Sequence, residues 1–112
     1  MKYYHNPRCQ KSRQGLALLE EKGQKPELVL YMKEAISPDQ LFTLLDKLDL
    51  DAEDILRTKE KVWKEEFADK ELSEEEVVLA MIEYPQLMER PILELEDKAV
   101  VGRPPENLLE IL

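Results

Sequence analysis

Short apolar segments alternate along the chain with longer stretches in which leucine recurs at helical spacing. Residues 2–5 are rich in aromatic side chains and predict a strand that ends at Asn6-Pro7, because proline fixes φ and Asn-Pro favours a turn. From 10 to 22 the apolar positions suit a helix packed on one face, and Gly23 predicts its end. Residues 27–31 have the pattern of a buried strand.

The middle of the chain is patterned for helices. Ser37 and Ser73 each begin a capping-box sequence, with Gln or Glu three residues later, and Asp51 is a third candidate cap that would open a short helix through residues 55 and 56. The helix after Ser37 is supported by apolar residues at positions i, i+3, i+4 and i+7, which are Leu41, Leu44, Leu45 and Leu48. The helix after Ser73 should end at Tyr84-Pro85.

The C-terminal part returns to strand patterns. Residues 92–95 and 98–101 predict a hairpin, and 106–112 predict a last amphipathic helix. The full order is strand, helix, strand, helical block, hairpin, helix. This α/β order predicts a thioredoxin-like fold with a helical insertion at about 37–85 between its two halves.

Composition limits the size and location of the protein. A chain of 112 residues with 43% apolar content is expected to form a single domain, residues 1–112, around one modest core. No apolar run reaches the ~18 to 20 residues that span a bilayer, and the N-terminus lacks the apolar stretch of a signal peptide, so we expect a cytoplasmic protein. The net charge of −9 argues against broad binding to nucleic acid or to anionic membranes.

Cys9 is the single cysteine and the best candidate for chemistry. It lies at the predicted start of the first helix, where free backbone N–H groups and the helix dipole stabilise a thiolate and can bind an oxyanion. We expect the neighbouring His5, Arg8, Lys11 and Arg13 to lower the pKa of this thiol from its ordinary value of about 8.5. The alternative is an inert, buried cysteine.

Ser12 stands where a dithiol motif would have its second cysteine. An internal disulfide cannot form, so an oxidised Cys9 would need an external thiol to resolve it. The sequence therefore predicts monothiol chemistry.

The sequence HNPRCQKSR at residues 5–13 resembles the H-N-P-x-C-x-x-S-R active-site signature of the glutaredoxin-coupled arsenate reductases, a thioredoxin-fold family with a helical insertion. Three further segments resemble family motifs in the family's order. Residues 55–57 (ILR) correspond to its L-L-R segment, 89–92 (ERPI) to N-R-P-I, and 102–106 (GRPPE) to R-P-S-E. The resemblance covers nearly the whole chain.

The resemblance implies roles for individual residues. Cys9 would attack arsenate, and His5 would favour the thiolate. The oxyanion would be held by Arg57, Arg90 and Arg103, whose planar guanidinium groups suit a tetrahedral oxyanion.

The resemblance also implies the reductants and the supporting structure. Glutathione would attack the arsenylated cysteine and glutaredoxin would release arsenite, with no metal and no bound organic cofactor. Ser12 and Arg13, which the signature includes, are expected on structural grounds to have a supporting role, capping and positioning the first helix. Pro91 would follow a cis peptide bond, as the thioredoxin fold usually has beside its catalytic loop.

Other interpretations remain open at this point. The fold also resembles Spx-type regulators that bind RNA polymerase, although Ser12 removes the C-x-x-C pair through which these sense oxidation. A glutathione-dependent reductase of disulfides is a second alternative. Arg57, Arg90 and Arg103 could be ordinary surface charges, and His5 a structural hydrogen-bonding residue.

Overall fold

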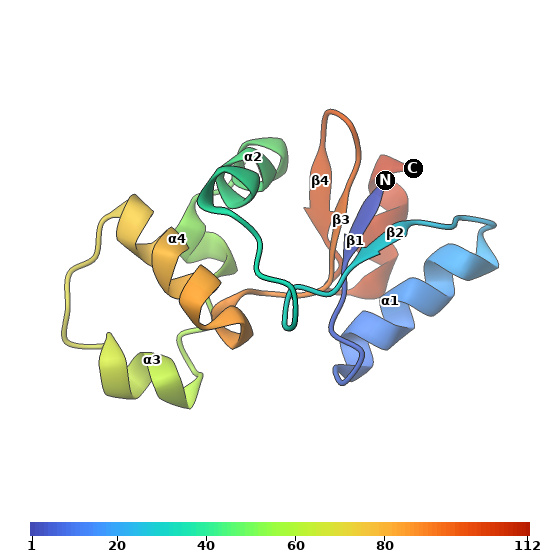
Figure 1. The fold of residues 1–112 in the computed structure, drawn as a ribbon. Coiled ribbons are helices and arrows are strands. Elements are labelled where there is room, and N and C mark those ends of the chain that lie inside the picture. Colours follow the sequence, from blue (N-terminus) through green and yellow to red (C-terminus); the bar gives the residue numbers. More distant parts are fainter. The chain divides into compact units, whose positions relative to one another are not determined.

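The chain forms its elements in the predicted order (Figure 1). The computed structural model describes all 112 residues, 1–112. The strands are β1 (Lys2–Tyr4), β2 (Glu27–Val29), β3 (Ile92–Glu94) and β4 (Ala99–Val101). The helices are α1 (Gln10–Glu21), α2 (Pro38–Leu48), α3 (Lys61–Glu66) and α4 (Glu74–Glu83), with 3-10 helices η1 (Ala52–Ile55), η2 (Pro85–Leu87) and η3 (Pro105–Ile111).

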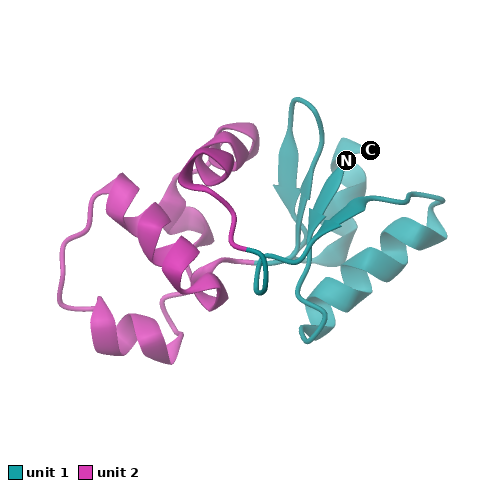
Figure 2. Ribbon diagram, in the orientation of Figure 1, with its two compact units in different colours: residues 1–34, 90–112 teal, residues 35–89 magenta.

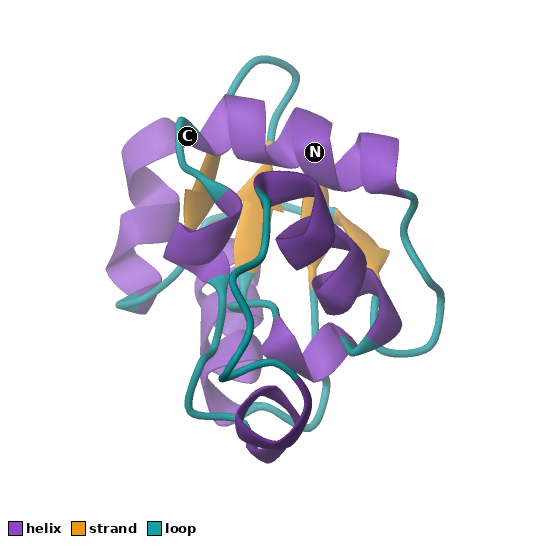
Figure 3. Ribbon diagram, turned by 90° about the vertical axis from the view of Figure 1, so that its left-hand side faces the viewer, coloured by secondary structure: helices purple, strands orange, loops and turns teal.

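The chain divides into two compact units (Figure 2). Unit 1 consists of Met1–Glu34 and Arg90–Leu112, and unit 2 of Ala35–Glu89. All four strands belong to unit 1, whereas unit 2 consists of helices and their connections (Figure 3). The predicted helical block at 37–85 lies within unit 2.

The strands of unit 1 form one sheet in the order β2-β1-β3-β4. β1 pairs parallel with β2 and antiparallel with β3, and β3 pairs antiparallel with β4. A βαβ unit followed by an antiparallel hairpin and a helix is the thioredoxin-like arrangement that the sequence predicts. The prediction of a buried strand at 27–31 is wrong for β2, because β2 forms the edge of the sheet and Leu28 is 44% exposed.

The core of unit 1 joins the sheet to two helices on one face. The pairing aligns Tyr3, Leu93 and Val100 across neighbouring strands, so their side chains share that face. Tyr3 and Leu93 are fully buried against Leu19 of α1 and Leu108 of η3. This contact fixes α1, and therefore the residues at its N-terminus, against the sheet.

The ends of the helices follow the capping sequences. Both capping boxes form as predicted: the Ser37 and Ser73 hydroxyls accept from the N–H groups of Gln40 and Glu76, and the serine N–H groups donate back to the Gln40 and Glu76 side chains. Gly23 has φ +77° and ends α1. The helices predicted after Asp51 and at the C-terminus are instead the 3-10 helices η1 and η3, and α3 was not predicted.

Unit 2 is centred on the buried faces of α2 and α4, which contribute Leu41, Leu44, Leu45, Val77, Val78 and Met81. An isolated bridge pairs Leu56 with Met88, and it is flanked by hydrogen bonds from Arg57 N–H to Leu87 O (2.7 Å) and from Glu89 N–H to Ile55 O (2.8 Å).

No helix of the structure combines the length and the apolar character needed to cross a membrane.

Candidate active site

Three segments that are far apart in the sequence meet in unit 1 at the same ends of three neighbouring strands. Tyr4, Ile92 and Val101 are neighbours across β1, β3 and β4, so the residues after β1, before β3 and after β4 come together. The Gly102 N–H donates to Pro91 O over 2.8 Å and joins two of these segments. The loop after β1 leads to Cys9, the residues before β3 are Arg90 and Pro91, and Arg103 follows β4.

Cys9 is the N-cap residue of α1, with φ −93° and ψ 123°. Its carbonyl accepts the first helical bond from Arg13 N–H (3.0 Å), and its own N–H donates to Asn6 O (2.9 Å). The Cys9 side chain makes no capping bond, and the thiol is half-buried. The position at the helix N-terminus predicted from the sequence is confirmed.

Two arginines flank the thiol. Arg103 Nη2 lies 3.8 Å from Cys9 Sγ, within hydrogen-bonding reach of sulfur, and Arg103 Nε donates to the backbone carbonyl of Arg90 (2.6 Å). The Arg90 side chain also hydrogen-bonds the thiol. The peptide bonds Arg90-Pro91 and Arg103-Pro104 are both cis, so the isomer expected at Pro91 is confirmed, and the second was not predicted.

The pKa of Cys9 lies below its ordinary value, as expected. Burial raises this pKa, but hydrogen bonds from the N–H groups of Ser12 and Lys11, together with the hydrogen bond and charge of Arg90, outweigh burial. The contribution of the backbone N–H groups was expected, whereas the contribution of Arg90 was not. The thiolate is stabilised by backbone donors and an arginine from beside β3, rather than by the side-chain charges of Arg8, Lys11 and Arg13.

His5 and Ser12 form a buried polar pair that joins the catalytic loop to the first turn of α1. His5 Nδ1 and Ser12 Oγ are 2.7 Å apart, and Ser12 Oγ also accepts from Asn6 N–H (3.0 Å). Burial and the nearby charge of Arg13 lower the pKa of His5, which favours the neutral ring. Ser12 therefore links His5 to the first turn of α1, the turn whose N–H groups contact Cys9.

Two further hydrogen bonds fix the loop and the helix. Arg13 Nη1 donates to Pro7 O (2.9 Å), which holds the loop to the first turn of α1. Tyr3 Oη, fully buried, donates to Ser12 O (2.7 Å). Tyr3 was not identified from the sequence as part of the site, because its aromatic side chain is equally typical of a core strand.

Arg57 belongs to unit 2. Its guanidinium forms ion pairs with Glu89 (3.0 Å) and Glu60 (3.5 Å), and Arg57 is about one-quarter exposed. The Arg57 N–H donates a hydrogen bond to the carbonyl of Leu87, which lies three residues before Arg90 in the sequence. The structure thus brings together Cys9, Arg90 and Arg103 in unit 1, and places Arg57 in the helical unit.

No group of three or more His, Cys, Asp or Glu side chains is arranged to hold a metal ion. What the site does offer is a stabilised thiolate at a helix N-terminus with two guanidinium groups beside it. Such an arrangement suits nucleophilic attack by sulfur on an electrophile that carries negative charge.

Comparison with known proteins gives matches over almost the whole chain. The model of the ArsC family matches residues 4–111. The chain is 48% identical over 114 residues to the uncharacterized protein YfgD of Escherichia coli (100% of this chain, 96% of that protein). It is 45% identical to an arsenate reductase of Haemophilus influenzae (97% and 96% covered). The solved structure of an arsenate reductase from Vibrio cholerae superposes with a TM-score of 0.93 at 42% identity, covering 100% of this chain and 98% of that one.

Proposed function

The chain belongs to the ArsC family, and on that premise we propose that it is an arsenate reductase that acts through the single thiol of Cys9. The observation that carries the proposal is the contact of Arg103 Nη2 with Cys9 Sγ, at a thiol that Arg90 also hydrogen-bonds. A thiolate in contact with two guanidinium groups can receive an oxyanion whose oxygens those groups bind while sulfur attacks its central atom.

In the first step, the Cys9 thiolate forms a bond to arsenic, and one arsenic–oxygen bond breaks. The departing oxygen takes up protons and leaves as water. Arg90 and Arg103 offset the negative charge of the remaining oxygens, which would otherwise repel the thiolate. Arsenic is still As(V) at this stage.

Reduction needs two further thiols. Glutathione forms a second arsenic–sulfur bond, and another oxygen leaves as water. A glutaredoxin thiolate then attacks the glutathione sulfur, which produces a mixed disulfide and leaves the electron pair of the arsenic–sulfur bond on arsenic. Arsenic becomes As(III), and hydrolysis of its bond to Cys9 releases arsenite and restores the thiol. No metal or bound organic cofactor takes part.

His5, Ser12 and Arg13 have positioning roles in this proposal. His5 favours the thiolate through Ser12, which holds the first turn of α1 with its N–H groups toward sulfur. Arg13 holds the loop through Pro7 O. Arg57 is proposed as a third ligand of the oxyanion, on the basis of the family motif in which it stands.

The test is arsenate-dependent oxidation of NADPH, coupled through glutathione, glutathione reductase and glutaredoxin. Wild-type protein should turn over, and Cys9→Ser should abolish turnover. Arg57→Ala, Arg90→Ala and Arg103→Ala should each lower kcat/KM for arsenate by about 10- to 100-fold, the effect of losing one charge-assisted hydrogen bond of ~1.5–3 kcal/mol.

Matched controls remove a positive charge elsewhere in the same unit. Lys59→Ala, in unit 2 with Arg57, and Lys22→Ala, at the far end of α1, should both keep wild-type turnover, because both lysines are exposed and neither belongs to the site. Full turnover in Cys9→Ser, or no arsenate-dependent turnover in folded wild-type protein, would contradict the proposal. Full turnover in Arg57→Ala alone would remove only the third ligand.

A further inference from the structure

A pocket of about 360 Å³ opens beside the loop that leads to Cys9. One wall is made of His5, Asn6, Pro7 and Arg8. The other wall is made of Leu30, Met32 and Lys33, from the turn that follows β2. The volume falls within the range of small-molecule sites, ~300–1,000 Å³. All of these residues belong to unit 1, and none of them is a ligand of the Cys9 thiol.

The lining of this pocket is basic, although the chain as a whole is acidic. The whole sequence has 25 acidic and 16 basic residues, yet the lining contains Arg8 and Lys33 and no carboxylate. A second groove in unit 1 runs along α1 and contains Lys11 together with Glu21 and Glu106. Of the two, only the pocket beside Arg8 suits an anionic ligand.

The two walls are held together by backbone hydrogen bonds. His5 N–H donates to Val29 O (3.0 Å), which continues the β1–β2 pairing into the loop. The turn after β2 is closed by two bonds to Leu30 O, both 2.9 Å, from the N–H groups of Lys33 and Glu34. The Arg8 N–H donates to Asn6 Oδ1 (3.1 Å). These bonds fix the backbone of both walls, which limits the part of the entropy cost of binding that comes from ordering the backbone.

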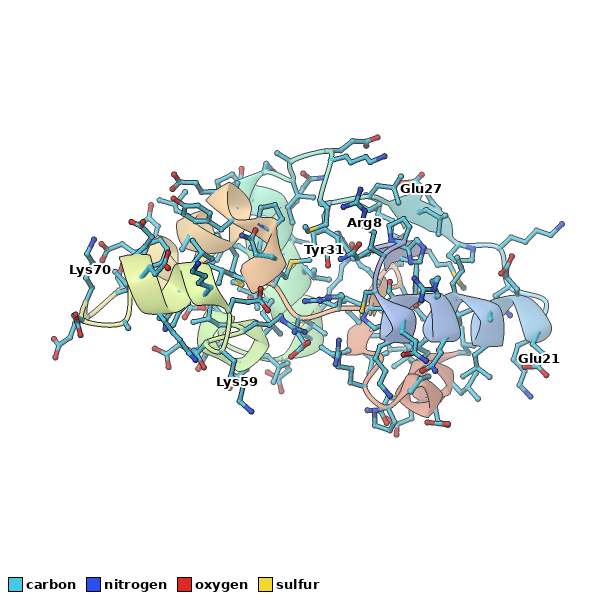
Figure 4. The ribbon with its side chains drawn as sticks, turned by 90° about the horizontal axis from the view of Figure 1, so that it is seen from below. Arg8, Glu21, Glu27, Tyr31, Lys59 and Lys70 are labelled. Carbon is cyan, nitrogen blue, oxygen red and sulfur yellow. The ribbon has the colours of Figure 1, made fainter.

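The pocket lies next to the catalytic cysteine along the chain. Arg8 directly precedes Cys9, so their Cα atoms are about 3.8 Å apart across one peptide unit. Figure 4 shows Arg8 at the start of α1 and Glu21 at its far end. Figure 4 also shows Tyr31, the neighbour of Leu30 and Met32, near Arg8. A ligand in this pocket would lie next to the catalytic loop.

We propose that this pocket is the subsite for glutathione, with Arg8 and Lys33 facing its two carboxylates and Leu30 and Met32 contacting its methylene groups. The inference rests on the proposed function and identifies where the first external thiol binds. From there the glutathione sulfur forms its bond to the arsenic carried by Cys9, as one oxygen leaves arsenic as water and the thiol proton passes to solvent.

The test measures steady-state kinetics with glutathione varied at saturating arsenate, and with arsenate varied at saturating glutathione. Arg8→Gln and Lys33→Gln should each raise the KM for glutathione about threefold, and the double variant about tenfold, because each side chain is exposed and each ion pair is modest. The KM for arsenate should stay within about twofold of wild type. Lys22→Gln, an exposed lysine away from the pocket, is the matched control and should leave both constants unchanged.

An uncharged ester of glutathione separates recognition of the two carboxylates from other contributions to glutathione binding. Glutathione with both carboxylates esterified should be used equally poorly by wild-type protein and by the double variant. An unchanged KM for glutathione in the double variant would overturn the proposal. So would a rise in the KM for arsenate alone, because the pocket would then serve the oxyanion.

A binding measurement keeps this inference separate from the assignment of arsenate. Titration of the folded protein with S-methylglutathione, which cannot react, should show binding to wild type and about tenfold weaker binding to the double variant. If wild-type protein shows no arsenate turnover but binds S-methylglutathione in this way, the proposed function fails and the subsite stands. Absence of binding to wild type would overturn the subsite whatever the turnover.

Discussion

Gly15 tests how tightly α1 must approach the sheet to hold the site in place. A Cβ at this position would meet Tyr3 Oη, and it would lie 3.0 Å from Leu108 Cδ1 and 3.2 Å from Pro91 Cγ. Tyr3 and Leu108 are fully buried, and Pro91 is the cis-proline next to Arg90. These three side chains come from β1, from the residue before β3 and from η3, so they cannot all move away together.

Gly15→Ala sets a gain in helix propensity against two losses. Alanine in a helix interior is favoured over glycine by about 1 kcal/mol. Overpacking a core site costs about 2 kcal/mol, and displacing Tyr3 Oη from Ser12 O loses a buried hydrogen bond of about 1 kcal/mol. The losses exceed the gain, so the free energy of unfolding should fall by about 2 kcal/mol.

Urea unfolding followed by far-UV circular dichroism measures the change. Trp63, the single tryptophan, lies in unit 2, so its fluorescence follows that unit separately. Tyr3→Phe supplies the control background. Without the hydroxyl the main contact is removed, and Gly15→Ala should then cost less than about 1 kcal/mol. A stabilised Gly15→Ala in the wild-type background would show that helix propensity outweighs packing and would refute the reasoning.

Two titrations test the electrostatics of the site. The rate of Cys9 alkylation against pH should have a midpoint below the ordinary value of about 8.5, and Arg90→Ala should raise it, because a hydrogen bond and a charge that favour the thiolate are lost. His5, the single histidine, should titrate below its ordinary pKa of about 6.5 by NMR, and Arg13→Gln should raise that pKa by removing a positive charge. The pKa of His5 is lower in the folded protein than in the unfolded chain, so the unfolded chain binds more protons just below about pH 6.5. The free energy of unfolding should therefore decrease as the pH falls through that range.

Each titration has a result that contradicts it. An alkylation midpoint that is unchanged in Arg90→Ala would leave the N–H groups of Ser12 and Lys11 as the main support of the thiolate. A His5 ring that titrates above its ordinary pKa would show that the pair with Ser12 favours the protonated ring. The exposed Lys22→Ala should leave both titrations unchanged.

The site depends on sheet register more than on local sequence. Arg90 and Arg103 are distant from Cys9 in sequence, and they reach the thiol because Tyr4, Ile92 and Val101 are aligned across three strands. A shift of one residue in either pairing would turn the side chains of that strand to the opposite face. The buried alignment of Tyr3 with Leu93 opposes such a shift.

The sequence by itself determined the order of the elements, the capping boxes at Ser37 and Ser73, the end of α1 at Gly23, and the position of Cys9 at a helix N-terminus. These features are decided within a few residues by φ preferences and by bonds between neighbouring side chains and backbone. The four motifs in register were also sufficient to indicate the family, which the comparisons confirm.

Only the tertiary structure decided which groups stabilise the thiolate. The sequence predicted the contribution of the N–H groups at the helix N-terminus together with that of the neighbouring cationic side chains, but the structure assigns the side-chain contribution to Arg90, which is distant in sequence. It also showed β2 to be an exposed edge strand, and it revealed the bond from Tyr3 to Ser12. These outcomes depend on the distances between segments that the sheet brings together, and side-chain type and spacing along the chain do not encode those distances.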